Sequence, residues 1–348
     1  MRNVPPCLRR IASFGLGLTP KLRTPPECVK PRIIALIVLS ASSLCAQNAT
    51  DASRHAMQFV TVEKDVKLEV LDWGGAGRPL VFLAGLGDTA HVFDTFAPQF
   101  TGHYHAYGIT RRGFGASSKP PLIVANYTAD RLGDDVLAVI AALKLTRPVL
   151  VGHSIAGEEL SSIGSRHPEK VSGLIYLDAA LPFAYYNRAN NPWLLDMLDL
   201  KKRIDALQAG AAFDHQFVDG MLQSASQLED DLKQEKQRAA SMPDAHLALG
   251  PPQGLPIIFG EEKYTEIHDP VLAIFACPPN FDFIRNNPAL KAAMKADISS
   301  RCLAQAKALQ AGVPSAHIVR LAGADHNVFR SNQADVVREM NAFLARLP

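Results

Sequence analysis

The chain has 348 residues, of which 47% are hydrophobic and 20% charged, and this is enough to bury a large core as one domain or as a core with a smaller accessory part. The first 46 residues hold seven of the 36 Lys and Arg but one of the 34 Asp and Glu, which leaves 29 bases against 33 acids. This mildly acidic body argues against nucleic acid and against an anionic membrane as partners.

The N-terminus has the pattern of an export signal. Basic residues ending in Lys30-Pro31-Arg32 precede an apolar run, 33–44, that is too short to span a bilayer but suits a signal peptide. We expect residues 1–46 to be a signal peptide cleaved after Ala46. The mature protein would then be exported, periplasmic or secreted, without a stable membrane partner. The alternatives are an uncleaved anchor or a buried core strand.

Cysteine usage agrees with export. Three of the five cysteines lie in the expected signal peptide, so Cys277 and Cys302 remain in the mature chain. An even pair in an exported protein predicts a disulfide, with two buried free thiols as the alternative. No His/Cys cluster has the spacing of zinc ligands, and we expect neither a metal nor a cofactor.

From residue 58, short β-rich runs alternate with helical stretches. A hairpin and four further strands are predicted at 59–62, 68–71, 80–83, 104–109, 148–151 and 171–177, with a helix at 128–143. A Thr-Ala-Asp start at residue 128 can cap that helix. The alternation is typical of an α/β protein with a mostly parallel sheet flanked by helices.

The alternation stops in residues 182–268. This stretch has no convincing strand, but it has two Leu-rich amphipathic helical segments, 193–207 and 217–242. We interpret it as an inserted helical lid that divides the core into 47–181 and 269–348. Strands and helices return in the second part at 271–275, 289–309, 316–321 and 333–347.

A sharp turn with a serine at its apex follows the strand at 148–151. The sequence there is Gly152-His153-Ser154-Ile155-Ala156-Gly157, and a helical stretch comes next. A strand–turn–helix arrangement of this kind exposes the hydroxyl at the carboxyl edge of the sheet and aims the helix N-terminus at developing charge. Ser154 is therefore the predicted nucleophile, with Ala156 in place of the second glycine of G-x-S-x-G.

A serine hydroxyl needs a base and an oxyanion site to react at neutral pH. His326 lies in the loop 323–327 after the strand at 316–321, which would bring it to the edge where Ser154 lies. The glycine-rich turn 84–88 follows the strand at 80–83, and glycine lets its backbone approach a substrate closely. We predict His326 as the general base and the N–H groups of Leu86 and Ile155 as the oxyanion donors.

These motifs together resemble the α/β-hydrolase superfamily, and in particular its lidded branch of esterases, haloperoxidase-like enzymes, haloalkane dehalogenases and epoxide hydrolases. The resemblance runs from about residue 58 to the end and rests on four segments, 85–87, 112–117, 152–154 and 325–326. Two positions depart from the pattern: Ala84 stands where many relatives have His, and Thr110 where many have Asp. The resemblance implies that the lid shapes the substrate pocket.

Serine rather than aspartate at position 154 excludes the alkyl-enzyme chemistry of dehalogenases and epoxide hydrolases. The resemblance then implies a hydrolase that cleaves a small-molecule carboxylic ester through an acyl-enzyme on Ser154. An amidase, lactonase, perhydrolase or C–C bond hydrolase with the same triad is the alternative. A ligand receptor on the same scaffold is a further one.

The triad acid is the least regular part of the pattern. Most relatives place it after the seventh strand, but here Pro279 occupies the expected position. Asp282 lies three residues further on. Asp178 ends the strand at 171–177, a position where some dehalogenase-like relatives carry their carboxylate. We expect Asp178, with Asp282 as the main alternative and Glu261 as a further candidate.

Overall fold

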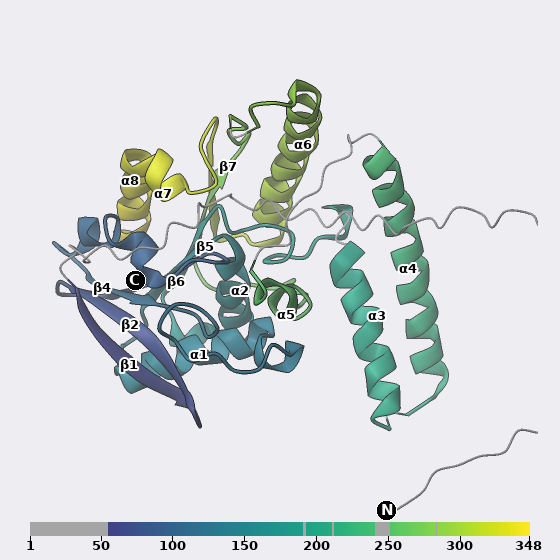
Figure 1. The fold of residues 1–348 in the computed structure, drawn as a ribbon, viewed down its shortest axis with the longest axis horizontal. Helices are drawn as coiled ribbons and strands as arrows, with labels where there is room; N and C mark the ends of the chain where they lie inside the picture. Colours follow the sequence, from purple (N-terminus) through teal and green to yellow (C-terminus); the bar gives the residue numbers. More distant parts are fainter. Residues whose placement is uncertain (1–54, 191–192, 211, 241–250, 283) are drawn as a thin grey trace, which may run out of the picture. The chain divides into compact units, whose positions relative to one another are not determined.

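A computed structural model describes residues 55–190, 193–210, 212–240, 251–282 and 284–348 (Figure 1). The expected signal peptide, residues 1–46, lies outside the described residues. One eight-stranded sheet forms the core, with the strand order β1-β2-β4-β3-β5-β6-β7-β8. The strands are β1 (Ala56–Glu63), β2 (Val66–Gly74), β3 (Pro79–Leu83), β4 (His105–Ile109), β5 (Val149–His153), β6 (Gly173–Leu177), β7 (Val271–Ala276) and β8 (Ala316–Leu321).

The sheet is mostly parallel. Strand β2 pairs antiparallel with both β1 and β4, and every other pair is parallel. Leu83 of β3 pairs with Gly152 of β5, and His153 of β5 pairs with Leu177 of β6. The turns after these three strands therefore lie side by side at one edge of the sheet, and they contain Leu86, Ser154 and Asp178.

Apolar side chains cover both faces of the sheet. One cluster joins it to α1 (Ala129–Ala142), α2 (Gly157–Arg166) and α6 (Pro288–Gly312). The other joins it to α7 (Val328–Ser331), α8 (Gln333–Leu344) and two short 3-10 helices, η1 (Ala90–Phe93) and η2 (Ala97–Phe100). Thr128 caps α1 by accepting the N–H of Arg131, as its sequence predicts.

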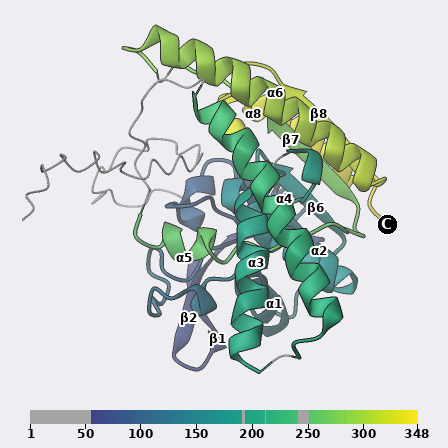
Figure 2. The ribbon, with the colours of Figure 1, turned by 90° about the vertical axis from the view of Figure 1, so that its right-hand side faces the viewer.

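The insertion, residues 182–268, separates β6 from β7 and contains no strand among its described residues. Its helices are α3 (Trp193–Gln208), α4 (His215–Ala240) and α5 (Gly254–Ile258), and α3 and α4 lie side by side (Figure 2). Lys263 Nζ lies 2.7 Å from Asp196 Oδ1, which ties α3 to the segment that leads back to the core. This ion pair thus fixes α3, and α4 packs against α3.

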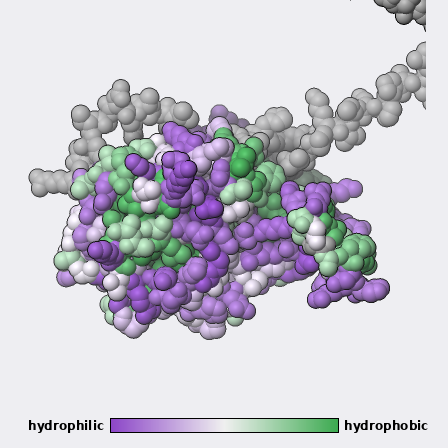
Figure 3. Space-filling view, turned by 90° about the horizontal axis from the view of Figure 1, so that it is seen from below, coloured by the Kyte–Doolittle hydropathy of each residue, from purple (hydrophilic) through white to green (hydrophobic). Residues whose placement is uncertain are grey.

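Apolar side chains are exposed at the end of the α3–α4 pair, on the right of Figure 3. Phe213, between the two helices, is 74% exposed and Leu222 on α4 is 65% exposed.

Among the described residues, no helix is long and apolar enough to cross a membrane.

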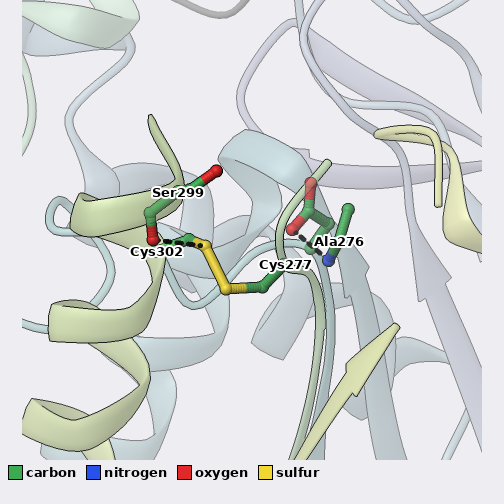
Figure 4. Close-up of a disulfide and its surroundings, with 5 residues drawn as sticks. Ala276, Cys277, Ser299 and Cys302 are labelled. Atoms are coloured by element: carbon green, nitrogen blue, oxygen red, sulfur yellow. Dashed lines mark hydrogen bonds between the residues drawn. A yellow bond between two sulfur atoms is a disulfide. The ribbon is translucent and has the colours of Figure 1, made fainter. Parts of the chain in front are cut away.

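The predicted disulfide is confirmed. Cys277, directly after β7, is bonded to Cys302 in α6, and their Cα atoms lie 5.9 Å apart (Figure 4). The bridge joins the carboxyl end of a central strand to the helix that packs on the sheet. It therefore fixes the backbone next to the edge where the three turns meet.

Candidate active site

Ser154 lies in a strained turn between β5 and α2. Its φ is 53°, a left-handed conformation that costs a residue with a Cβ of order 1–3 kcal/mol. The carboxyl end of β5 and the start of α2 hold it there, since β5 is fully buried and the first residues of α2 are buried too. Strain of this kind projects the hydroxyl away from the sheet, as the strand–turn–helix pattern predicts.

His326 lies between Ser154 and Asp178. Its Nε2 is 2.8 Å from Ser154 Oγ, and its Nδ1 is 2.7 Å from Asp178 Oδ2. The His326 and Asp178 side chains are 13% and 12% exposed, so both are largely shielded from water. When Nδ1–H donates to the carboxylate, the lone pair of Nε2 faces the hydroxyl proton.

Asp178 is anchored by the neighbouring strand β7. Its backbone N–H donates to Ile274 O at 2.7 Å, and its Oδ1 accepts the N–H of Ala276 at 2.9 Å. Its φ of 47° is left-handed, like that of Ser154. With one oxygen bound to β7, the other is directed at His326.

The two other candidates for the acid lie elsewhere. Asp282 is 81% exposed and its Oδ1 is paired with Lys291 Nζ at 2.8 Å. Lys291 also lowers the pKa of the Asp282 carboxyl. Glu261 is buried against Glu158, the second residue of α2. Of the three carboxyls, the structure brings Asp178 to the imidazole.

The turn after β3 lies against the nucleophile. A Cβ added to Gly85 would lie 3.3 Å from Ser154 Cβ and 2.8 Å from His153 Nδ1, so glycine is needed for this close approach. Leu86 follows in the same turn. Its side chain and that of Ile155 belong to one apolar cluster, which also contains Phe114 and Ile257.

Arg111 braces that turn, a role that the sequence alone did not indicate. Its guanidinium donates to Ala84 O at 2.9 Å and to Gly85 O at 3.4 Å, and it pairs with Glu159 of α2 at 3.0 Å. In a trans peptide the C=O and N–H point in opposite directions. Holding Gly85 O therefore directs the N–H of Leu86 away from the guanidinium.

Two further polar side chains lie close to His326. His153 Nε2 donates to His326 O at 3.1 Å, and burial lowers the pKa of His153 well below its usual range, so this ring stays neutral. Burial raises the pKa of Asp88, and the nearby Arg330 and His326 offset part of that effect. Asp88 lies in the predicted turn 84–88, and no motif in the sequence indicated this electrostatic interaction with His326.

The threonine that departs from the family pattern has a defined role. Thr110 Oγ1 donates to Glu69 Oε2 at 2.6 Å and accepts the N–H of Ala90 at 3.0 Å. Glu69 thus holds the Thr110 hydroxyl in place, and this hydroxyl accepts the N–H of the first residue of η1, just after the glycine-rich turn. The departure therefore leaves this turn anchored.

The sequence model of the alpha/beta hydrolase fold matches residues 78–319. The chain belongs to this family. It is 31% identical over 153 residues to the AB hydrolase superfamily protein YisY of Bacillus subtilis, a match that covers 43% of this chain and 55% of that protein. It is 30% identical over 118 residues to 3-oxoadipate enol-lactonase 2 of Acinetobacter baylyi, covering 34% and 43%. The chain thus spans about half the length of these curated relatives.

Solved structures show the same fold. A bromoperoxidase from Bacillus anthracis superposes with a TM-score of 0.52 at 16% identity, covering 83% of this chain and 100% of that one. An epoxide hydrolase from Bacillus megaterium gives a TM-score of 0.52 at 18% identity, with the same coverage. These neighbours confirm the predicted α/β-hydrolase fold.

Proposed function

We propose that this hydrolase cleaves carboxylic esters through an acyl-enzyme on Ser154, with His326 as general base and Asp178 as the triad acid. One observation carries the proposal: a continuous hydrogen-bonded chain runs from Ser154 Oγ through both nitrogens of His326 to Asp178, at 2.8 and 2.7 Å. Serine, base and orienting carboxylate in this order form the arrangement that activates a hydroxyl for acyl transfer.

In the proposed first step, Ser154 Oγ attacks the ester carbonyl carbon while its proton passes to His326 Nε2. The carbonyl oxygen takes the negative charge, and the N–H groups of Leu86 and Ile155 donate to it. The C–O bond to the alcohol then breaks, and His326 returns its proton to the departing oxygen. An acyl-enzyme and a free alcohol result.

Water completes the cycle. His326 Nε2 takes a proton from the water, whose oxygen attacks the acyl carbon and forms a second tetrahedral intermediate. Collapse of this intermediate breaks the bond to Ser154 Oγ, which regains the proton, and the carboxylic acid leaves. Asp178 stays ionised throughout and stabilises the imidazolium that forms in each half of the cycle.

The surroundings of Ser154 support an apolar acyl group as the substrate moiety. Leu86 and Ile155 carry the two oxyanion donors, and their side chains pack with Phe114 and with Ile257 of α5. Because α5 belongs to residues 182–268, we propose that this insertion acts as a lid that shapes the pocket. An apolar lining of this kind favours a hydrocarbon chain over a charged one.

A lactone is the second candidate substrate. The relative from Acinetobacter baylyi that shares 30% identity over 118 residues is named as an enol-lactonase. A lactone is a cyclic ester, so the same attack opens the ring and the alcohol stays attached to the acyl group. The chemistry demanded of Ser154 and His326 is the same for both substrates.

The proposed setting is outside the cytoplasm. A disulfide between Cys277 and Cys302 is typical of proteins from oxidising compartments, and this supports the expected export of the mature chain. Fractionation of cells that express the full chain tests this point. Recovery of the protein in the cytoplasm, at the mass of the full-length chain, would contradict it.

The test of the proposed function uses a fluorophosphonate probe and a series of p-nitrophenyl esters that differ in acyl chain length. The wild type should be labelled once and should turn over the esters. Ser154→Ala should lose labelling and lose turnover by roughly 10⁴–10⁶-fold, because it lacks the nucleophilic hydroxyl. It should stay folded, since the turn keeps its backbone and loses only an oxygen.

Ser165→Ala is the matched control, since Ser165 lies on α2 and its hydroxyl donates to Glu266 O. This variant should keep both labelling and turnover. A γ-lactone and an anilide of the same acyl chain extend the series and separate lactonase from amidase. Probe labelling without turnover of any member would favour a ligand receptor and overturn the proposal.

A further inference from the structure

Three side chains capable of binding a metal meet where η1 faces the start of β1. They are His55, directly before β1, His91 in η1, and Asp94 at the end of η1. One nitrogen or oxygen from each lies within 4.8 Å of those of the other two. The three residues are far apart in the sequence or lack a zinc-ligand spacing, which is why sequence analysis found no site here.

The spacing of these atoms fits a metal ion. Asp94 Oδ1 is 3.2 Å from His55 Nδ1, and Asp94 Oδ2 is 3.1 Å from His91 Nδ1. With bonds of about 2.0–2.1 Å to zinc, neighbouring ligands of a tetrahedral site lie about 3.3 Å apart. Each histidine nitrogen thus lies at about that spacing from one carboxylate oxygen of Asp94, and one ligand atom from each residue lies within 4.8 Å of the other two. The His91 side chain is 37% exposed, which leaves this side of the cluster open to solvent.

Two buried residues of β2, Trp73 and Glu69, contact the candidate ligands Asp94 and His91. Trp73 Nε1 donates to Asp94 Oδ1 at 2.9 Å, which orients the carboxylate. Glu69 Oε1 lies 3.6 Å from His91 Nε2, the ring nitrogen that faces away from Asp94. Histidines that bind a metal commonly direct their second nitrogen to a carboxylate, and ligating carboxylates are themselves hydrogen-bonded. Both arrangements are present before any ion arrives.

Glu69 is itself fixed, because its other oxygen accepts the Thr110 hydroxyl at 2.6 Å. That hydroxyl also holds the N–H of Ala90, the residue before His91. The residues that contact the cluster are thus joined to η1 by a connected set of hydrogen bonds.

We propose that His55, His91 and Asp94 bind one Zn²⁺ ion, with a water molecule as the fourth ligand. Two imidazoles and one carboxylate are a ligand set that zinc accepts readily. The ion would tie the start of β1 to η1, which begins two residues after the turn 84–88 that carries Leu86. Its role is to stabilise the folded chain, because a ligand that binds only the native state shifts the unfolding equilibrium.

The test uses the exported protein without a histidine tag, stripped of metal with a chelator. Calorimetric titration with ZnCl₂ should give one site per chain, and the ion should raise the unfolding temperature. Co²⁺ in place of Zn²⁺ should give visible absorption bands of a four-coordinate site. His91→Ala and Asp94→Asn should each weaken Zn²⁺ binding at least tenfold and abolish the increase in the unfolding temperature.

His105→Ala is the matched control. His105 also pairs with an aspartate, Asp72, at 2.8 Å, but the described residues place no third metal-binding side chain beside this pair. This variant should bind Zn²⁺ as the wild type does. Circular dichroism establishes that each variant is folded, and a variant that does not fold is replaced by His55→Gln. Failure of the wild type to bind Zn²⁺, or equal binding by His91→Ala and Asp94→Asn, overturns the proposal.

Discussion

Ala276 donates its backbone N–H to Asp178 Oδ1 at 2.9 Å, one residue before the disulfide-bonded Cys277 (Figure 4). The strand β7, after which the family resemblance leads one to expect the triad acid, here supplies a hydrogen-bond donor to Asp178, the acid that we propose, which directly follows β6. Because that donor occupies Oδ1, the remaining oxygen faces His326 Nδ1 at 2.7 Å. In the proposed triad, the acid thus follows β6, and β7 orients it through this hydrogen bond.

Asp178→Asn should reduce kcat for a p-nitrophenyl ester by roughly 10³–10⁴-fold. An amide at this position donates as readily as it accepts, so it no longer fixes Nδ1 as the protonated nitrogen of His326. The proton then moves to Nε2, where it blocks acceptance of the Ser154 proton. Steady-state kinetics and thermal unfolding of the same preparation are the measurements, and the unfolding temperature should change little.

Asp282→Asn is the control for that result. Asp282 is 81% exposed and paired with Lys291, and a surface ion pair contributes little to stability. We expect this variant to keep nearly full activity. An inactive Asp282→Asn together with an active Asp178→Asn would show that the acid follows β7 after all.

The fold could be predicted largely because its strands are short, strongly apolar runs, such as Leu80–Leu83 and Val271–Phe275, that flank regular amphipathic helices. The ends of the strands were predicted less accurately: the strand predicted at 171–177 begins at Gly173. Helix α5 (Gly254–Ile258) was not predicted, because five residues that include Pro256 show no helical periodicity. Its formation depends on the apolar cluster that Ile257 joins.

Within the candidate site, Ser154 and His326 could be placed from local motifs, since each follows a strand that ends at the same edge. Asp178 was expected as the acid, but local motifs could not exclude Asp282, because the choice depends on the hydrogen bond to Ala276, 98 positions along the chain. The brace between Arg111 and Glu159 joins residues 48 positions apart, and no sequence period connects them. Contacts of this kind arise from the order of strands in the sheet.

Removal of the disulfide should lower stability and also disturb the acid. In the chain-entropy model a bridge across 25 residues contributes about 3 kcal/mol. The double variant Cys277→Ser/Cys302→Ser should therefore unfold at a clearly lower temperature than the wild type. Its kcat should fall as well, since Cys277 adjoins the N–H that holds Asp178. Calorimetry and ester kinetics measure the two effects.

Dithiothreitol provides the matched comparison for the disulfide. It should lower the unfolding temperature of the wild type toward that of the double variant and leave the double variant unchanged. Equal unfolding temperatures of the two proteins without reductant would show that the bridge does not stabilise the native state.

The turn at Ser154 should be intolerant of a second methyl group. A Cβ on Gly152 would lie 2.6 Å from Leu160 Cδ1 and 3.2 Å from Ala156 Cβ, and Ala156 already fills the place of the second motif glycine. Gly152→Ala should therefore destabilise the protein by about 1–3 kcal/mol, the usual cost of overpacking. Gly102→Ala, where nothing lies within 4 Å of the added carbon, should leave the unfolding temperature nearly unchanged. Chemical denaturation of both variants measures the difference, and equal losses would contradict the packing argument.

The last prediction concerns two carboxyls buried against one another, Glu158 of α2 and Glu261 after α5. Burial raises the pKa of Glu261 to about 8, and burial together with the charge of Glu261 raises the pKa of Glu158 well above its usual range. In the unfolded chain both groups release their protons near pH 4.5. The folded chain therefore holds more protons than the unfolded chain between these limits. The free energy of unfolding must then fall as the pH rises from about 4.5 to about 8.

Glu261→Gln should weaken this pH dependence. A glutamine keeps a neutral polar group opposite Glu158 and removes one of the two groups that must lose a proton in the core. Its unfolding temperature should match that of the wild type near pH 5 and exceed it near pH 9, with the gap opening between these values. Asp231 and Asp269 have pKa values raised to about 7 by burial, but both proteins retain them, so the difference between the two curves isolates Glu261. Glu266→Gln, at a side chain that is 76% exposed, should follow the wild-type curve. Parallel curves for wild type and Glu261→Gln across this range would show that the two buried carboxyls do not hold a proton in the folded state.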